Sequence, residues 1–436
     1  MSRTLRPALT ALLFIATYAA ANVARAEGFN TKHLFVTDES NPLVAEIDEE
    51  GHLFNIFNLG AGVDGEAIGS SATQGVVMSP KGTMLVVRGR NTIVQVKPNG
   101  NKKIGMAPTA TFPSYVTVGP QGRLYAAGND GVHVFAIIDN PALPSLTITD
   151  LNTISNGGKL VPKGLAFGPD GMLYVADASS GSIQRFTPDG MFVGSFGELE
   201  SPEGLIFLPD GSLLAADDAT NSIEHIDAGT GNTIESFTDK SLNAPRGLAL
   251  TQLGTVMICS TTSDNVLALD IDTGNFSLFS FEVSNPFACA VAPQRFKVSI
   301  SGKMRVDGQK PAQTLQNEEA VLALDPATGN AVLDLKGDEN PSPELDFVSP
   351  GQGVLGQDMF TFNGFISFAE TSAHRQMHST EAAQPGPTSG GADLTMLLNG
   401  TPGPFRFNIK TGSGRMNVYG PNRVGQFDIR LKKKLN

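Results

Sequence analysis

One phrase recurs along this chain at intervals of about forty residues, which is typical of a β-propeller. It is clearest as Gly164-Leu-Ala-Phe-Gly-Pro-Asp-Gly171-Met-Leu-Tyr-Val-Ala-Asp177. A second copy runs from Gly204 to Asp217, and looser copies begin at Gly75, Tyr115 and Gly247. The glycines that close the phrase lie 40, 49, 40 and 43 residues apart: Gly82, Gly122, Gly171, Gly211 and Gly254.

Each copy predicts one four-stranded unit. Residues 165–167 form a short apolar strand, and the Gly-Pro-Asp-Gly run that follows has turn chemistry, because proline presets φ and glycine tolerates a positive φ. Residues 173–176 form a second apolar strand, and residues 182–186 alternate polar and apolar side chains. Such a unit leaves both faces apolar, so it is stable only when it stacks against its neighbours.

The two ends of the repeat region predict how the ring closes. Residues 34–38 match a second strand, but no matching first strand precedes them. The first-strand pattern recurs late, in residues 285–293, without a normal second strand after it. We therefore expect residues 285–293 to lie beside residues 33–48 and close a six-bladed, all-β propeller over residues 29–294. A seventh blade would need residues 296–335, whose 309–319 stretch fits the repeat poorly.

Beyond the repeat, residues 295–436 predict a second, β-rich domain. Apolar segments such as 297–300, 320–324, 405–409 and 426–431 have strand character, and a Pro/Gly-rich loop at 384–391 separates some of them. We expect a β-sandwich-like domain here.

The first 26 residues predict a cleavable signal peptide. Arg3 and Arg6 precede an apolar stretch, and Ala24-Arg-Ala26 supplies a small-x-small cleavage pattern before Glu27. We expect a periplasmic or secreted protein with no integral membrane segment, since no later stretch is apolar enough to span a bilayer. The formal charge of −12 becomes −15 on losing three arginines and no acid, which disfavours nucleic acid as a partner.

The chain has two cysteines, Cys259 and Cys289, at the end of a second strand and in the following first strand. They are expected to be neighbours. An oxidising compartment permits a disulfide between them, and two buried thiols remain the alternative.

The segment Val161-Pro-Lys-Gly-Leu-Ala-Phe-Gly-Pro-Asp-Gly-Met-Leu-Tyr-Val-Ala-Asp177, followed by Ser182-Ile-Gln-Arg-Phe, resembles an NHL repeat. The wider relatives of that repeat are the calcium-dependent lactonases (senescence marker protein 30 and the gluconolactonases) and the streptogramin-lyase-like propellers. The resemblance implies a six-bladed propeller over about 265 residues. It does not imply one function, because such propellers include enzymes, protein binders and ligand binders.

The repeat frame predicts which side chains lie near the ring axis. The position before each first strand reads Gln74, Ser114, Lys163, Glu203, Arg246 and Phe287. In the lactonases this position often holds an Asn or Asp that binds the metal. Here one carboxylate is flanked by two cations, which is a poor site for a hard dication that requires several oxygen ligands. We therefore predict no metal and no cofactor, with Ca²⁺ retained only under a lactonase-like alternative.

Two interpretations of this column remain open. Lys163, Glu203 and Arg246 form either a mutually neutralising ion-pair ring or a site for an anion or a carboxylate-bearing ligand, with Gln74 beside it. At the ends of the second strands, Asp38, Arg88, Gly128, Asp177, Asp217 and Ser260 form another column, whose acids are expected to bind backbone amides.

Two functions follow. The first is an exported recognition module for a protein, a glycan or a small ligand. The second is a lactonase-like or lyase-like enzyme with a divergent central site. The missing acidic column favours the first.

Overall fold

The computed structural model describes residues 28–60, 73–79, 82–89, 91–107, 114–119, 123–138, 143–306, 313–325, 330–335, 347–349, 351–355, 359–364, 367–368, 405–408, 413–420 and 423–434. The signal-peptide prediction for residues 1–26 lies outside them. Apart from one short 3-10 helix, η3 (Thr261–Ser263), the regular elements described are strands. None of the described residues forms a helix that is long and apolar enough to cross a bilayer.

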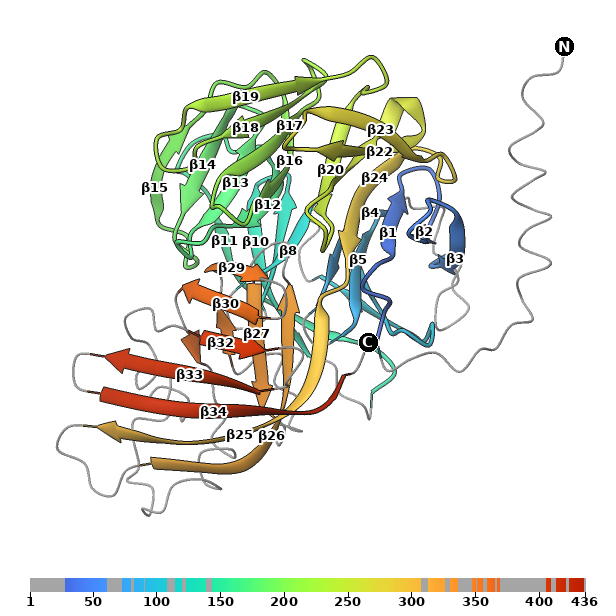
Figure 1. Cartoon of the computed structure of the whole chain (residues 1–436). Coiled ribbons are helices and arrows are strands. Elements are labelled where there is room, and N and C mark those ends of the chain that lie inside the picture. Colours follow the sequence, from blue (N-terminus) through green and yellow to red (C-terminus); the bar gives the residue numbers. More distant parts are fainter. Residues whose placement is uncertain are drawn as a thin grey trace, which may run out of the picture.

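Six four-stranded antiparallel sheets make up the first part of the chain (Figure 1). The first contains, in hydrogen-bonded order, β24 (Pro286–Val291), β1 (Leu34–Asp38), β2 (Leu43–Ile47) and β3 (Leu53–Asn58). The second contains β4 (Thr73–Met78), β5 (Met84–Arg88), β6 (Thr92–Val96) and β7 (Lys102–Met106). The third contains β8 (Val116–Val118), β9 (Leu124–Gly128), β10 (Gly131–Ile138) and β11 (Thr147–Ile154).

The remaining three sheets follow the same plan. The fourth contains β12 (Pro162–Phe167), β13 (Leu173–Asp177), β14 (Ser182–Phe186) and β15 (Phe192–Phe196). The fifth contains β16 (Pro202–Phe207), β17 (Leu213–Asp217), β18 (Ser222–Ile226) and β19 (Thr233–Thr238). The sixth contains β20 (Pro245–Leu250), β21 (Val256–Ser260), β22 (Asn265–Asp270) and β23 (Asn275–Ser280).

The sheets close into a ring, a β-propeller. The first strands contact one another in the cyclic order β4, β8, β12, β16, β20, β24 and back to β4. β24 pairs antiparallel with β1, placing Leu34 opposite Val291 and Val36 opposite Cys289. The predicted ring closure by residues 285–293 is confirmed. It joins the two ends of the repeat region within one sheet.

The repeated turn behaves as its residues predict. Gly171 and Gly211 have φ values of +77° and +89°. The amide of Gly171 donates to the Gly168 carbonyl at 2.9 Å, and Asp170 accepts from the Met172 amide at 3.0 Å. Glycine is required at the positive φ because a Cβ is disfavoured there.

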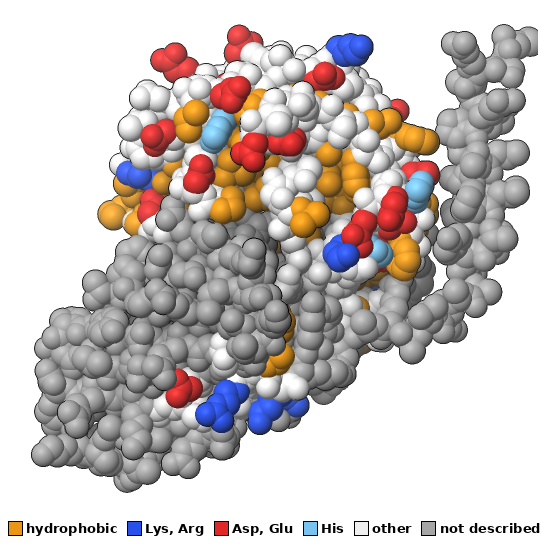
Figure 2. Space-filling view, in the orientation of Figure 1, with side chains coloured by type: hydrophobic (Ala, Val, Ile, Leu, Met, Phe, Trp, Pro, Cys, Tyr) orange, Lys and Arg blue, Asp and Glu red, His pale blue; other side chains and the backbone are white. Residues whose placement is uncertain are grey.

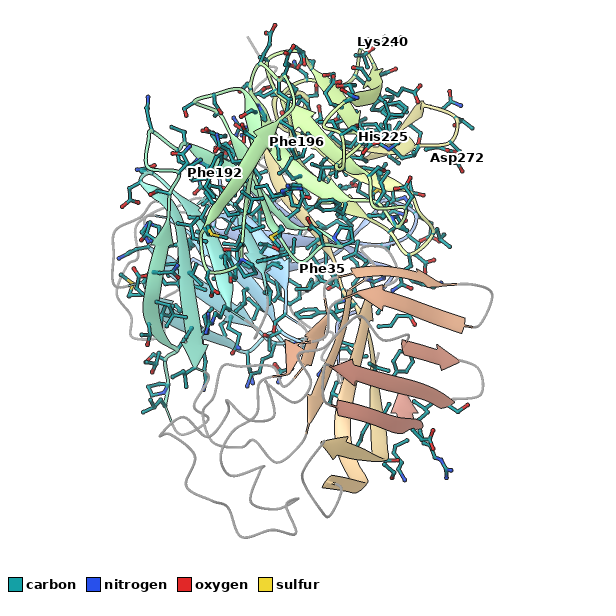
Figure 3. All side chains as sticks on the ribbon, turned by 90° about the vertical axis from the view of Figure 1, so that its left-hand side faces the viewer. Phe35, Phe192, Phe196, His225, Lys240 and Asp272 are labelled. Carbon is teal, nitrogen blue, oxygen red and sulfur yellow. The ribbon has the colours of Figure 1, made fainter. Side chains whose placement is uncertain are left out.

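The core lies between the faces of adjacent sheets. Every residue of the second strands β1, β5, β9, β13, β17 and β21 is buried. Phe35, for example, is fully buried, whereas Phe192, Lys240 and Asp272, also labelled in Figure 3, are exposed. Burial of large apolar side chains between sheets is what holds such a ring together.

Glycines allow the first strands to approach closely. A Cβ on Gly164 would lie 2.2 Å from the Glu203 carbonyl oxygen, and one on Gly204 would lie 2.0 Å from that of Arg246. At Gly247 it would lie 2.5 Å from the Cα of Ala288. The backbones of adjacent first strands therefore pack directly against each other at one end of the ring.

The C-terminal part is β-rich, as expected. Its described strands form one ten-stranded sheet rather than two separately bonded sheets of a sandwich, because β25 joins a strand from each side. In hydrogen-bonded order the strands are β29 (Gly351–Leu355), β30 (Met359–Gly364), β32 (Phe405–Asn408), β33 (Ser413–Gly420), β34 (Arg423–Lys434), β25 (Gln294–Val306), β26 (Gln313–Asp325), β27 (Asn330–Leu335), β28 (Phe347–Ser349) and β31 (Ser367–Phe368).

Candidate functional site

The predicted column of axial residues lies at one end of the ring. Gln74, Lys163, Glu203, Arg246 and Phe287 are each the second residue of their first strands. These strands contact their neighbours around the ring and start from the same end. We call this place the N-terminal end of the first strands.

Lys163, Glu203 and Tyr115 form one hydrogen-bonded group at this end. Lys163 Nζ donates to Glu203 Oε1 at 2.9 Å, and the Tyr115 hydroxyl donates to Oε2 at 2.8 Å. Glu203 is only 4% exposed, while the Lys163 side chain is 32% exposed. Both carboxylate oxygens of Glu203 are thus occupied by donors from two other blades, 88 and 40 residues away in sequence.

Tyr115 is a neutral donor in this group. Burial, and secondarily the nearby Glu203 carboxylate, raise the pKa of Tyr115 well above its ordinary value. The ionised phenolate is disfavoured because it would be desolvated next to another negative charge. The hydroxyl therefore keeps its proton and donates a hydrogen bond to Glu203.

Arg246 has a different partner from the one expected. Its Nη1 donates to Glu39 Oε2 at 2.6 Å, not to Glu203. The guanidinium carbon lies 5.4 Å from the centre of the Phe287 ring, and that ring lies 5.0 Å from the ring of Tyr115. Burial opposes the charge of Arg246, but the carboxylates of Glu39 and Glu203 raise its pKa. The expectation of a three-membered ion-pair ring is wrong in this respect, because Glu39 lies nearer.

Arg246 retains binding capacity. Its Nε is buried and has no hydrogen-bond partner among the described residues, and its side chain is 23% exposed. An arginine fixed by a carboxylate on one nitrogen and by an aromatic face is held in one orientation. The exposed part of its side chain is thus held in a fixed position.

The predicted Gln74 lies in the same register but makes a different contact. Its backbone carbonyl accepts a hydrogen bond from Thr37 Oγ1 at 2.6 Å, which ties the first strand of the second blade to β1. The Gln74 side chain is half-buried. Gln74 borders the group at the N-terminal end without joining its ion pairs.

Sequence reasoning missed Glu39 and Tyr115. Glu39 follows β1 directly, in the blade whose first strand comes from the far end of the repeat region. Tyr115 occupies a column that otherwise holds only small residues: Gly75, Gly164, Gly204, Gly247 and Ala288. A single aromatic residue in a column of small ones was a signal that the sequence contained.

The acids at the ends of the second strands have the predicted structural role. Asp177 accepts from the amides of Val161 and Ser179, both at 3.0 Å, and Asp217 accepts from those of Glu200 and Ser201 at 2.7 and 2.9 Å. Although burial alone would raise it, the pKa of Asp177 is lowered by these donors. Arg88, in the same column, cannot act in this way.

Neither a metal cluster nor a disulfide is found among the described residues. No group of three His, Cys, Asp or Glu side chains there is arranged to hold a metal ion. Cys259 and Cys289 are free, buried thiols. Burial, and secondarily the neighbouring Cys289 thiol, raise the pKa of Cys259 well above its ordinary value. The structure thus has the thiol form of the two alternatives.

No protein-family model and no curated protein matches this chain. Solved structures that are similar include virginiamycin B lyase from Staphylococcus aureus, with 14% identity, a TM-score of 0.40 and coverage of 67% of this chain and 91% of that one. A nidogen/laminin complex has 15% identity, a TM-score of 0.45 and coverage of 59% of this chain and 97% of that one. A putative gluconolactonase has 23% identity, a TM-score of 0.38 and coverage of 47% and 76%. These likenesses concern the β-propeller fold alone.

Proposed function

We propose that this protein is an exported, NHL-type propeller that recognises a ligand at the N-terminal end of its first strands. The ligand carries a carboxylate or another anionic group, on a protein, a glycan or a small molecule. The carrying observation is Arg246, which Glu39 and Phe287 hold in one orientation while its side chain remains 23% exposed. Periplasmic or secreted localisation is part of this proposal and rests on residues 1–26.

The charges at this end favour recognition by contact over long-range attraction. Lys163 and Glu203 compensate each other, as do Arg246 and Glu39. The visible face of the described propeller carries many carboxylates and few basic side chains (Figure 2). An anionic group would therefore gain little from the protein's overall field, and its binding would depend on directed hydrogen bonds from Arg246 and Lys163.

Two aromatic side chains beside Arg246 add to this support. Phe287 and Tyr115 are buried and lie in tilted contact beside Arg246. Apolar surface beside a few oriented polar groups is the usual composition of a small-ligand site. A ligand with an anionic group on an apolar or sugar body matches that composition.

A ligand screen tests the proposal. Thermal shifts would be measured for wild type against carboxylate-bearing small molecules, acidic glycans and acidic peptides, and hits would be repeated with Arg246→Met. The expected result is a hit whose affinity falls about 10- to 100-fold in Arg246→Met, as loss of a charged hydrogen bond predicts. Lys240→Gln, at an exposed position, is the matched control (Figure 3). Hits that bind Arg246→Met and wild type equally would contradict the proposal.

The alternative is a lactonase-like or lyase-like enzyme with a divergent central site. Its support is the Glu203 carboxylate, which is buried and lies between two proton donors. Lactone hydrolysis with and without Ca²⁺ tests it. Turnover that Glu203→Gln abolishes would favour the enzyme over the recognition module.

A further inference from the structure

The two ion pairs at the N-terminal end of the first strands belong to one connected group. Lys163 pairs with Glu203 at 2.9 Å, and Arg246 pairs with Glu39 at 2.6 Å. The hydroxyl that donates to Glu203 belongs to Tyr115, whose ring contacts the aromatic ring beside Arg246. A ligand at this end of the ring therefore meets carboxylates as well as cations.

The four charges differ in how far a ligand can reach them. The side chains of Lys163, Arg246 and Glu39 are 32%, 23% and 34% exposed. The side chain of Glu203 is only 5% exposed, and both of its carboxylate oxygens already accept hydrogen bonds. The accessible charges are thus two cations and one carboxylate, that of Glu39.

The charge balance of this group disfavours a simple anion. Lys163 and Arg246 are balanced by Glu203 and Glu39. Asp218 adds negative charge, because its carboxylate, with those of Glu39 and Glu203, raises the pKa of Arg246 against the effect of burial. An anion that took Arg246 from Glu39 would leave that carboxylate without its cation and would add a further negative charge. Leaving one partner of a partly buried ion pair alone is costly.

We infer that the ligand of this site is a zwitterion, which carries an ammonium group beside its carboxylate as an α-amino acid does. The inference rests on the proposed function, since the carboxylate is the group that Arg246 binds. The ammonium group binds Glu39 and replaces the cation that Glu39 gives up. Because the paired nitrogen and oxygen of Arg246 and Glu39 are 2.6 Å apart, a ligand with both charges on one carbon can meet both side chains.

Glu39 is then the residue that determines specificity. A molecule with the carboxylate but without the ammonium group leaves Glu39 unpaired, so the site rejects it. A zwitterion adds no net charge to the group, whereas a simple anion does. Glu39 thus selects among the carboxylate-bearing ligands that Arg246 alone would accept.

Matched probes test this selection by calorimetry at constant ionic strength. L-phenylalanine, hydrocinnamate and phenethylamine share one body and carry both charges, the carboxylate alone and the ammonium group alone. L-alanine, propionate and ethylamine repeat the comparison with a small body. The proteins are wild type, Glu39→Gln, Arg246→Met and the control Glu235→Gln, which changes an exposed acid on the outer strand β19.

Wild type should bind the amino acid of at least one set about 10-fold more tightly than the matching carboxylate and the matching amine. Glu39→Gln should weaken the amino acid and strengthen the carboxylate, so that the two bind alike. A merely structural role of Glu39 would weaken both probes together. Arg246→Met should lose both, and Glu235→Gln should behave as wild type.

The inference is overturned if wild type binds the carboxylate as tightly as the amino acid and Arg246→Met loses both, a result that leaves the proposed function standing. Amino-acid binding that Arg246→Met retains would overturn the inference and the proposed function together. If none of the six probes binds wild type or Glu39→Gln, the inference fails, while the wider screen of glycans and peptides still decides the proposed function.

Discussion

Replacing Gly204 by alanine should push apart β16 and β20, the strands that carry Glu203 and Arg246. The added Cβ would lie 2.0 Å from the Arg246 carbonyl oxygen and 3.1 Å from its carbon, where ordinary contact begins at 3.4 Å. The obstacle is backbone, so no side chain can move aside. Overpacking of this kind costs about 1–3 kcal/mol, and alanine recovers about 0.4–1 kcal/mol through the unfolded state. We expect a net loss of about 1–2 kcal/mol.

Gly194 provides the matched control. It lies on the outer strand β15, and a Cβ there would have nothing within 4 Å. Gly194→Ala should therefore leave the transition unchanged or raise it slightly, by the same unfolded-state effect. Gly204→Ala should lower it by about 3–8 °C. Because the chain has no tryptophan, circular dichroism and calorimetry are the suitable readouts.

The reasoning is refuted if the melting temperatures of Gly204→Ala and Gly194→Ala differ by less than about 1 °C, which is about the uncertainty of such a scan. That result would show that the first strands are not packed backbone to backbone. It would also remove the reason why Glu203 and Arg246 lie at one end of the ring. Ligands found in the screen should bind Gly204→Ala more weakly than Gly194→Ala.

Three further outcomes are expected. Gly171→Val and Gly211→Val should each lower the free energy of unfolding in urea by about 1–3 kcal/mol, because both glycines have positive φ. Variants as stable as wild type would show that these turns do not require a glycine. A chain truncated after Val283 loses β24 and should lack the cooperative propeller transition, whereas an unchanged transition would contradict ring closure. A thiol reagent at neutral pH should leave folded Cys259 and Cys289 unmodified and modify both in denaturant, and rapid reaction of folded protein would show that they are not buried.

The ring could be predicted because its determinants are local and repeated. Gly171 and Gly211 mark the same turn in two copies, and each copy has the strands that the turn requires. Ring closure followed from a strand missing at one end and surplus at the other. The sequence alone therefore predicts that residues 285–293 belong to the first sheet, and the pairing of β24 with β1 confirms it.

The pairing inside the site could not be predicted to the same depth. The register placed Lys163, Glu203 and Arg246 at one end of the ring, and Lys163 does pair with Glu203. Arg246 contacts Glu39, and that choice of carboxylate depends on side-chain rotamers. Glu39 follows β1 in the first sheet, which combines strands from the two ends of the repeat region. Aligning the repeats treats corresponding positions as equivalent, so the alignment cannot decide whether Arg246 contacts Glu39 or Glu203.

The C-terminal sheet shows another limit. Strand character was visible in its segments, but strand order was not. β25 pairs with β26, its neighbour in sequence, and also with β34 at the far end of the chain. Alternation and β-propensity identify a strand without naming its partner. A single large sheet and the two sheets of a sandwich therefore have similar sequence patterns.

Calcium calorimetry tests most directly whether the N-terminal end of the first strands is an anion-recognition site or a dication site. Glu203 lies there beside Lys163, with Arg246 nearby, and desolvating a dication next to two fixed cations is unfavourable. We predict no calcium binding at this end, no calcium-dependent rise in the melting temperature and no calcium-dependent lactone hydrolysis. Calcium binding with a Kd of about 1 μM, some 8 kcal/mol, that Glu203→Gln abolishes would contradict this account and favour the enzyme.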